Sequence, residues 1–331
     1  MRPVRLALAL LVAAALAPGT FVHTPPKPKV RNPTVAIAPL AIKEGRFGPL
    51  VLDGGWTLHG FRNMFGGYSA LVSLPDNRLM AASDTGRRLI FTRPDRRGPS
   101  PDLLWFGTAS DTDKILADLE SLTRDPGSGT LWGAYEGTNS IRRFGPELDV
   151  QGTIEPAQMA DWGDNTGAEA FVRLSDGRFL AIEEDPESWG GAVHRAVVFD
   201  GDPVAGASGA RLSAIVPDGY SPVDMALLDE TRILVLLRRL VFALPPAFDT
   251  AFAILDMDGI APGNTVELRL LAEAGDDIPK ENYEGLAVTE DAEGRHVWII
   301  SDDNMMRYQR TLLLRFRWDE RLVSRRQKAR E

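Results

Sequence analysis

The sequence contains no cysteine in its 331 residues. That absence excludes a disulfide framework, a thiolate nucleophile, a cysteine-ligated zinc ion and a lipid anchor on cysteine. Positive charge is also scarce, because 37 lysines and arginines face 46 aspartates and glutamates, for a net charge of -9. A molecule with this charge repels nucleic acid and acidic membrane surfaces. We therefore expect no nucleic-acid partner. An anionic ligand would need positive charge close to its binding site.

Three catalytic signatures are missing as well. The chain has no GxSxG elbow, no HExxH pair and no phosphate-cradling GxxxxGK(S/T) loop. These absences argue against a serine hydrolase, a zinc metalloprotease and an NTPase. If the protein is a hydrolase, its nucleophile is predicted to be water.

The longest apolar run, LALALLVAAALA, follows the positively charged start MRPVR and ends at a small-x-small cleavage pattern. This pattern predicts a signal peptide over residues 1–17 and a periplasmic or secreted protein with no membrane insertion after cleavage. The alternative is an uncleaved anchor, but the run is shorter than the roughly 20 residues that a spanning helix needs. Residues 18–33 read as a flexible proline-rich lead, 34–318 as the folded domain and 319–331 as a charged tail.

One phrase recurs five times along the chain: a short apolar strand, a polar turn and a second apolar strand. Its copies are YSALVSLPDNRLMAASD (68–84), LESLTRDPGSGTLWGAYEG (119–137), AEAFVRLSDGRFLAIEED (168–185), VDMALLDETRILVLLRR (223–239) and YEGLAVTEDAEGRHVWIISDD (283–303). A third strand follows each copy: LIFT (89–92), IRRF (141–144), AVVF (196–199), FAIL (252–255) and TLLLRF (311–316). Fourth strands are expected at LLWFG (103–107) and TVELRLL (265–271).

The spacing of these copies predicts a single all-β domain with the architecture of a β-propeller. Glu120, Glu169, Asp224 and Glu284 are separated by 49, 55 and 60 residues. A period near fifty with three or four antiparallel strands per unit is typical of five or six propeller blades. A β-sandwich also has regularly spaced strands, but it does not predict a recurring acidic phrase. The segments TVAIAPLAI (34–42) and LVLDGGWTLHG (50–60) are expected to pair with the C-terminal repeat and close the ring.

Acidic residues recur where the strands of each repeat begin and end. In a propeller, the start of the first strand and the end of the second lie on one face, so these carboxylates should surround one mouth of the channel. Those at strand starts are Glu120, Glu169, Asp224 and Glu284; those at strand ends are Asp84, Glu136, Glu183, Glu184, Asp302 and Asp303. Within NYEGLAV, the strand period of two places Glu284 on the same side as Leu286 and Val288.

Carboxylates packed this closely raise one another's pKa unless something compensates their charge. Oxygen ligands suit Ca²⁺ first, and Mg²⁺ or Mn²⁺ less well. The expected metal ligands are Glu120, Glu169, Asp224, Glu284, Asp302 and Asp303. Arginines recur near the same edge and can hold an anionic substrate; the candidates are Arg88, Arg142, Arg238 and Arg310. The competing interpretation is that such residues cap turns and form surface ion pairs.

Three C-terminal segments, NYEGLAV (282–288), ISDDN (300–304) and QRTLLLRF (309–316), resemble the phytase-like family, known as esterase-like activity of phytase. The resemblance extends from about residue 50 to 318. It implies a secreted bacterial propeller that hydrolyses phosphate or other esters through Asp and Glu, and we take Glu120, Glu169 and Glu284 as candidate catalytic residues. The first repeat departs from the pattern at Ser69, and the fourth replaces the acidic strand end with Arg238 and Arg239.

Two functions from different classes remain open. As an enzyme, the protein would hold Ca²⁺ in the acidic mouth and hydrolyse a small anionic or phosphorylated ester with a metal-bound water and a spare carboxylate as base. As a binding module, the same metal-stabilised propeller would hold a ligand or partner protein in the cell envelope without turnover. In both cases we expect a monomer.

Overall fold

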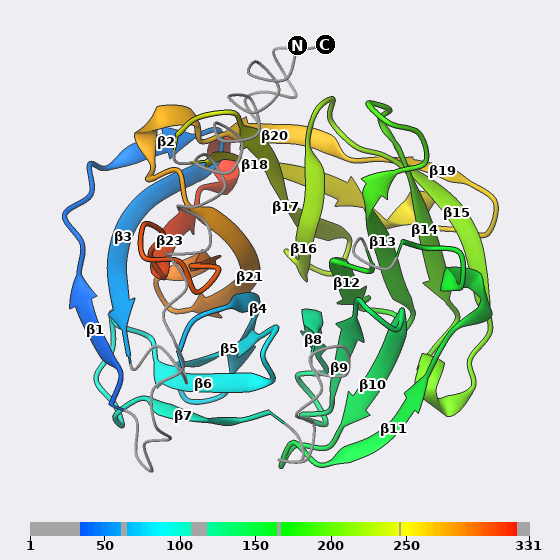
Figure 1. Ribbon diagram of the computed structural model, residues 1–331, viewed down its shortest axis with the longest axis horizontal. Helices are drawn as coiled ribbons and strands as arrows, with labels where there is room; N and C mark the ends of the chain where they lie inside the picture. Colours follow the sequence, from blue (N-terminus) through cyan, green and yellow to red (C-terminus); the bar gives the residue numbers. More distant parts are fainter. Residues whose placement is uncertain (1–33, 61–64, 107–117, 164–166, 245, 323–331) are drawn as a thin grey trace, which may run out of the picture.

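The computed structural model describes residues 34–60, 65–106, 118–163, 167–244 and 246–322. In these residues five β-sheets are arranged around a central axis (Figure 1). The all-β propeller prediction is confirmed, and the number of blades is five. The predicted signal peptide, the proline-rich lead and most of the charged tail lie outside the described residues. No helix in the described ranges is long and apolar enough to cross a membrane.

Blades I and II each follow the predicted order of four antiparallel strands, from the channel outward. Blade I contains β4 (Tyr68–Leu74), β5 (Arg78–Ser83), β6 (Arg87–Thr92) and β7 (Asp102–Trp105). Blade II contains β8 (Leu119–Arg124), β9 (Leu131–Tyr135), β10 (Ser140–Phe144) and β11 (Val150–Ile154). In blade I, the turn between the first two strands places Asp76 and Asn77 at positive φ, as the predicted turn residues require.

Blades III and IV share the segment that was expected to be one fourth strand. Blade III contains β12 (Ala170–Arg173), β13 (Phe179–Pro186), β14 (Val193–Phe199), β15 (Gly209–Ile215) and β19 (Thr265–Glu267). Blade IV contains β16 (Ser221–Leu227), β17 (Arg232–Val241), β18 (Ala247–Asp256) and β20 (Arg269–Glu273). The expected strand 265–271 breaks at Leu268, and its first part pairs in parallel with β15 of the neighbouring blade. Blade III is therefore larger than predicted and not wholly antiparallel.

Blade V closes the ring with strands from both parts of the chain, as predicted. It contains β1 (Ala36–Pro39), β2 (Gly45–Phe47), β3 (Leu50–His59), β21 (Asn282–Asp291), β22 (Gly294–Asp302) and β23 (Leu312–Trp318). The closing contact is the antiparallel pair of β3 and β23. Four short 3-10 helices occupy loops: Ala157–Met159, Pro203–Ala205, Met257–Gly259 and Gly275–Asp277.

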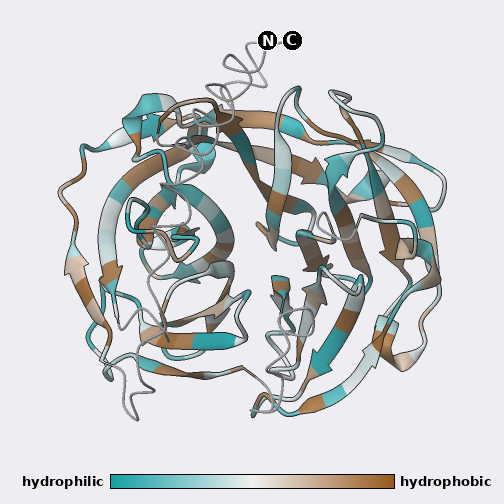
Figure 2. Ribbon diagram, in the orientation of Figure 1, coloured by the Kyte–Doolittle hydropathy of each residue, from teal (hydrophilic) through white to brown (hydrophobic). Residues whose placement is uncertain are grey.

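The core is divided among the five interfaces between blades. Because side chains alternate across a strand, Phe171 packs toward blade II while its neighbour Val172 packs toward blade IV. Apolar residues accordingly recur along the strands of every blade (Figure 2). The inner strands β4, β8, β12, β16 and β21 contact one another in turn around the axis. Their starting ends therefore form one mouth of the channel.

Candidate functional site

A β-bulge near the start of an inner strand marks the inner ring of the mouth. In four inner strands one residue is skipped in the pairing with the second strand. A bulge adds one residue to a strand and shifts the alternation of side chains. The skipped residues are Ser69, Glu120, Val223 and Glu284, and Glu169 precedes β12 at the matching place. Counting with a period of two through Glu284 is therefore wrong, because the bulge interrupts it.

The ends of the second strands form an outer ring of five equivalent positions. Each position at the end of a second strand pairs with the first residue of the inner strand of its blade, or with a residue that precedes that strand. Four positions hold carboxylates and one holds an arginine: Asp84, Glu136, Glu184, Asp302 and Arg238. The single cation in this ring lies in blade IV, between the acidic positions of blades III and V. Its charge is therefore placed to interact with both neighbours.

Arg238 binds carboxylates of both flanking blades. Its Nη2 lies 2.6 Å from Glu184 Oε1 and 3.7 Å from Glu169 Oε2, while its Nη1 forms a short contact with Glu284 Oε1. Nη1 also donates to Asn282 Oδ1 at 2.8 Å. Burial works against its charge, but the three carboxylates hold the pKa of Arg238 above its ordinary value. Part of the acidic mouth is thus neutralised by the protein itself.

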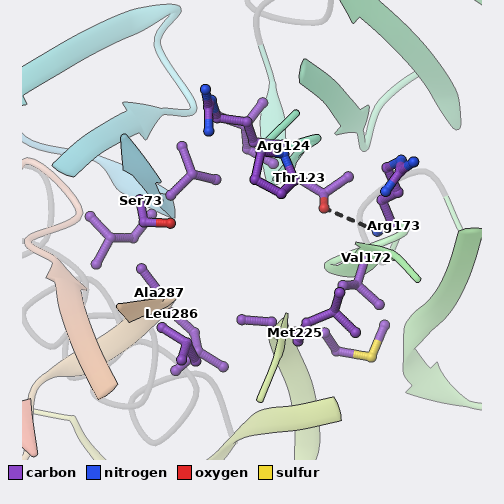
Figure 3. A pocket seen from close by; sticks show the side chains of 15 residues that line it. Ser73, Thr123, Arg124, Val172, Arg173, Met225, Leu286 and Ala287 are labelled. Atoms are coloured by element: carbon purple, nitrogen blue, oxygen red, sulfur yellow. Dashed lines mark hydrogen bonds between the residues drawn. The ribbon is translucent and has the colours of Figure 1, made fainter. Parts of the chain in front are cut away.

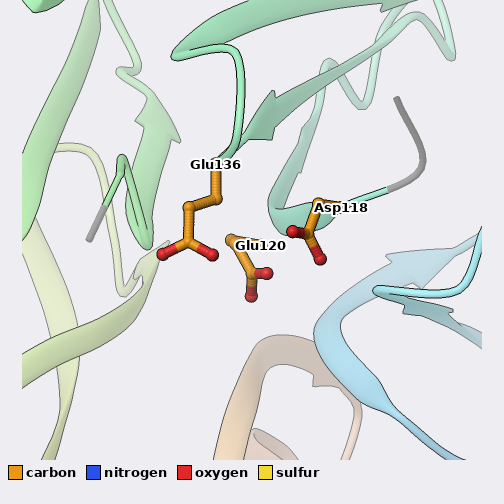
Figure 4. Close-up of side chains that lie close together, drawn as sticks. All are labelled: Asp118, Glu120 and Glu136. Atoms are coloured by element: carbon orange, nitrogen blue, oxygen red, sulfur yellow. The ribbon is translucent and has the colours of Figure 1, made fainter. Parts of the chain in front are cut away.

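The carboxylates of blade II form the tightest acidic group in the described chain. One oxygen from each of Asp118, Glu120 and Glu136 lies within 4.8 Å of the other two (Figure 4). Asp118 precedes β8, Glu120 is the second residue of β8, and Glu136 follows the end of β9. Burial first, and then the charges of Glu169 and Glu284, raise the pKa of Glu120 well above its ordinary value of 4.5. This group accordingly favours a proton or a bound cation.

Asp302 and Asp303 extend the acidic surface across blade V. Asp302 is buried, and burial followed by the charge of Glu284 raises its pKa well above the ordinary value. One of its oxygens accepts the Asn304 N–H at 2.7 Å. Asp303 Oδ1 accepts backbone N–H groups of Gly67 and Met305 at 3.3 and 3.1 Å. Both side chains are therefore partly committed to shaping the loop after β22.

Asp224 lies below the mouth, one residue beyond the ring position that Val223 occupies. It is fully buried and accepts hydrogen bonds from Ser121 Oγ at 3.0 Å, Met225 N at 2.8 Å and Leu286 N at 2.6 Å. The Leu71 backbone also bonds to it. Burial raises its pKa well above the ordinary value, although the hydrogen bonds oppose that shift. The structure thus places this predicted ligand in a clasp between inner strands, apart from the acidic group.

A cavity of about 160 Å³ lies at the other end of the inner strands (Figure 3). All five inner strands contribute to its lining, with apolar residues such as Val172, Met225 and Leu286, while Arg124 and Arg173 also border it. Its chemistry differs from that of the acidic mouth.

Each of the three other predicted arginines contacts a residue of its own blade. Arg88 Nη1 lies 3.4 Å from Asp102, Arg310 Nε lies 2.6 Å from Glu281, and the Arg142 guanidinium packs over Tyr135. Arg238, by contrast, contacts the predicted ring carboxylates Glu169 and Glu284.

Two further acidic residues, Glu183 and Asp118, differ from the sequence expectation. Glu183 is buried and binds Arg195 with both oxygens, at 2.5 and 2.6 Å, so it points away from the channel. Asp118 was not predicted. It lies opposite Glu136 in the hairpin, so the strand register of the repeat, rather than its spacing, is the signal that could have identified it.

Comparison with known proteins gives a family and several distant structures. The family model named phytase-like, described as esterase-like activity of phytase, matches residues 63–305. No curated protein matches the sequence. Among solved structures, hydrazine synthase of Kuenenia stuttgartiensis shares 13% identity with a TM-score of 0.37, over 71% of this chain and 56% of that one. The chain therefore spans little more than half the length of that protein.

Two further structures are similar over more of their length. U3-55K shares 10% identity with a TM-score of 0.43, over 87% of this chain and 99% of that one. Glutaminyl cyclase of Myxococcus xanthus shares 10% identity with a TM-score of 0.41, over 76% of this chain and 91% of that one.

Proposed function

The chain belongs to the phytase-like family, esterase-like activity of phytase, and from that premise we propose that it is an exported, metal-dependent hydrolase of a phosphate or other ester. The observation that carries the proposal is the carboxylate group of Asp118, Glu120 and Glu136 at the mouth. Arg238 binds carboxylates of blades III and V, and we place the ion in blade II because three carboxylate oxygens lie within 4.8 Å of one another there.

The residues of this group fit Ca²⁺. They offer carboxylate oxygens, which are the ligands that hard cations prefer, and one oxygen from each lies within 4.8 Å of the others. Burial first, and then the neighbouring carboxylates, raise the pKa of Glu120, and a bound cation would oppose that shift. Mg²⁺ and Mn²⁺ remain less favoured, because Ca²⁺ accepts more oxygen ligands in a less regular geometry.

In the proposed reaction, bound Ca²⁺ would supply positive charge that attracts the anionic substrate and favours ionisation of a water. Glu169 is a candidate for the base. Burial and the charge of Glu184 raise its pKa well above the ordinary value, which makes its carboxylate a stronger base than a solvated one. The water proton would pass to Glu169, and the water oxygen would form a bond to phosphorus or to the carbonyl carbon. The bond from that atom to the leaving oxygen would break, and the proton held by Glu169 would pass to the leaving oxygen, which departs as an alcohol.

The proposed substrate is a small anionic or phosphorylated ester, and the proposed location is the periplasm or the cell exterior, with the protein acting as a monomer. Glu284 and Glu169 are bound to Arg238, so we assign them to shaping and proton transfer rather than to the primary ligand set. If Ca²⁺ binds without turnover, the protein is instead a metal-stabilised binding module of the cell envelope.

The test is a calorimetric titration with Ca²⁺ at pH 5, 6 and 7, together with hydrolysis of p-nitrophenyl phosphate and p-nitrophenyl acetate. Glu120→Gln should lower Ca²⁺ affinity by about tenfold or more. Glu284→Gln is the matched control, and because its carboxylate is bound to Arg238 and Asn282 we expect a loss of about threefold or less. Because burial raises the pKa of Glu120 above its ordinary value, Ca²⁺ competes with a proton for this carboxylate. The affinity for Ca²⁺ should therefore rise with pH.

Chelation of Ca²⁺ should abolish hydrolysis of both esters. Equal Ca²⁺ affinity in the wild type and Glu120→Gln would contradict the assignment of the ion to blade II. Hydrolysis that survives chelation would contradict the metal dependence.

A further inference from the structure

The hairpin tip of blade IV carries three exposed large apolar side chains. Residues 240–248 read LVFALPPAF and contain no charge. Phe242 is 96% exposed and Leu244 100%, and Leu240 at the end of β17 is 48% exposed. Connecting segments normally carry polar residues, and a soluble surface seldom presents several large apolar side chains together. This tip is therefore unusual for a turn between two strands.

A second loop repeats the feature in the neighbouring blade. Trp189, between β13 and β14 of blade III, is 102% exposed. Apart from Trp189, Phe242 and Leu244, the exposed large hydrophobic residues of the described chain are between 38% and 48% exposed. We name Trp189, Leu240, Phe242 and Leu244 the apolar lip.

Short stretches of chain connect the apolar lip to residues of the acidic mouth. Phe242 follows Arg238 by four residues, which corresponds to about 13 Å of extended strand. Trp189 follows Glu184 by five residues, and the Arg238 and Glu184 side chains meet at 2.6 Å. Both loops thus leave the mouth from two adjoining residues of the outer ring. A ligand that reaches from the mouth over blades III and IV meets the lip.

We propose that the substrate is amphiphilic, with an anionic ester head in the mouth and an alkyl or aryl tail along the lip. This inference rests on the proposed function and adds the substrate class. A charged mouth alone suits any small anion, whereas a mouth that adjoins exposed aromatic and aliphatic side chains matches a molecule with one charged end and one apolar end. A bilayer is a weaker match, because the net charge of -9 and the acidic mouth repel anionic headgroups.

The experiment compares butyl phosphate with octyl phosphate, both as monomers, by calorimetric titration in the presence of Ca²⁺. The two probes have the same head and differ by four methylene groups, so their affinity ratio reports the tail. We expect octyl phosphate to bind about tenfold more tightly, which corresponds to partial burial of the added methylenes. Phe242→Ser combined with Leu244→Ser should reduce that ratio to about one without changing the affinity for butyl phosphate. Trp189→Ser should reduce it in part.

The matched control combines Leu104→Ser with Val150→Ser, on the outer strands of blades I and II. These residues are 46% and 39% exposed, and the control should keep the tenfold ratio. An equal affinity for the two probes in the wild type overturns the proposal, as does a failure of both to bind. A ratio that survives in the double lip variant also overturns it.

Hydrolysis of the short p-nitrophenyl esters separates this inference from the proposed function. If the protein hydrolyses these esters but does not prefer octyl phosphate, the amphiphilic substrate is contradicted and the proposed hydrolase function stands. If it prefers octyl phosphate through the lip but hydrolyses neither ester, the role of the lip is supported and the proposed hydrolase function is contradicted. If the lip variant loses sedimentation with zwitterionic phosphatidylcholine vesicles while the probe ratio stays unchanged, the lip is a membrane contact and the proposal is overturned.

Discussion

Arg238 is a positive charge within the acidic mouth, where it pairs with three carboxylates. Five equivalent positions lie at the ends of the second strands. Four of them hold an aspartate or glutamate, and Arg238 occupies the fifth. A carboxylate at this place would add negative charge beside Glu169, Glu184 and Glu284. The guanidinium instead offers several N–H donors in a rigid fork, so one side chain can bind groups from two blades. The protein thereby organises Glu169, Glu184 and Glu284 before any ligand arrives.

We predict that Arg238→Met lowers the free energy of unfolding by about 3 kcal/mol at pH 7, because it leaves nearly buried carboxylates without their partner. Ca²⁺ should recover part of the loss by neutralising the same mouth. The measurement is urea unfolding with and without Ca²⁺. Arg239→Met is the control, since its pair with Asp249 is more exposed and should contribute less than about 1 kcal/mol. Equal losses in the two variants would contradict the role of Arg238.

At the scale of the elements, the inner strands depend on side chains from neighbouring blades. Ser121 Oγ accepts the Phe171 N–H at 3.2 Å, and Asp224 accepts the Leu286 N–H at 2.6 Å. These bonds satisfy backbone donors on strand edges that have no further strand to pair with. The same strands approach closely where Gly285 faces blade I. The clasp between blades therefore needs both the polar bonds and a small residue.

We predict that Gly285→Ala destabilises the fold by about 2 kcal/mol. An added Cβ would lie 2.9 Å from the Leu71 backbone nitrogen and 2.6 Å from Ile300 Cγ2, so backbone would have to move. Gly259→Ala is the control, because its nearest neighbour, Val266 Cγ1, lies at 3.6 Å and leaves room. We expect that variant to change stability by about 0.5 kcal/mol or less. Thermal unfolding of both variants decides, and similar midpoints would refute the steric argument.

At the scale of the whole molecule, blade V holds the ring closed. Its β23 lies between β22 and β3, so strands more than 250 residues apart in the sequence share one sheet. An ion-pair network crosses from this blade to blade I: Arg93 lies 2.7 Å from Asp291, and Arg315 lies 2.8 Å from Asp53 and 2.9 Å from Asp95. Loss of β23 would leave the edges of β22 and β3 unpaired, and it would weaken the packing of blade V against blades IV and I.

We predict that Leu314→Ala, in the middle of β23, costs about 3 kcal/mol and keeps a single unfolding transition. Leu314 is fully buried and lies opposite Ile299 and Gly55 on the two flanking strands. Tryptophan fluorescence and far-ultraviolet circular dichroism should shift to the same lower urea midpoint. Leu104→Ala, at a half-exposed site, should change stability by about 0.5 kcal/mol or less. Separate midpoints for the two probes would show that blade V unfolds independently of the other blades.

Local patterns in the sequence determined the hairpins and the repeat. Strand alternation and turn residues act between neighbours in the chain, so the five phrases correspond to the first two strands of the five blades. The pairing of residues 50–60 with the C-terminal repeat was also predictable, because the leading segment lacked a phrase of its own. The number of blades was not, since five and six blades fit the same period.

Only the tertiary structure decided the frame and the partners of the site. The bulge in β16 puts Val223 in the ring and moves Asp224 below it, a shift of one residue that spacing near fifty cannot detect. Arg238 meets Glu184 and Glu284 across 54 and 46 residues of chain. The physical reason is that a strand encodes its own alternation, whereas the charge that a side chain faces depends on which blades the closed ring places beside it.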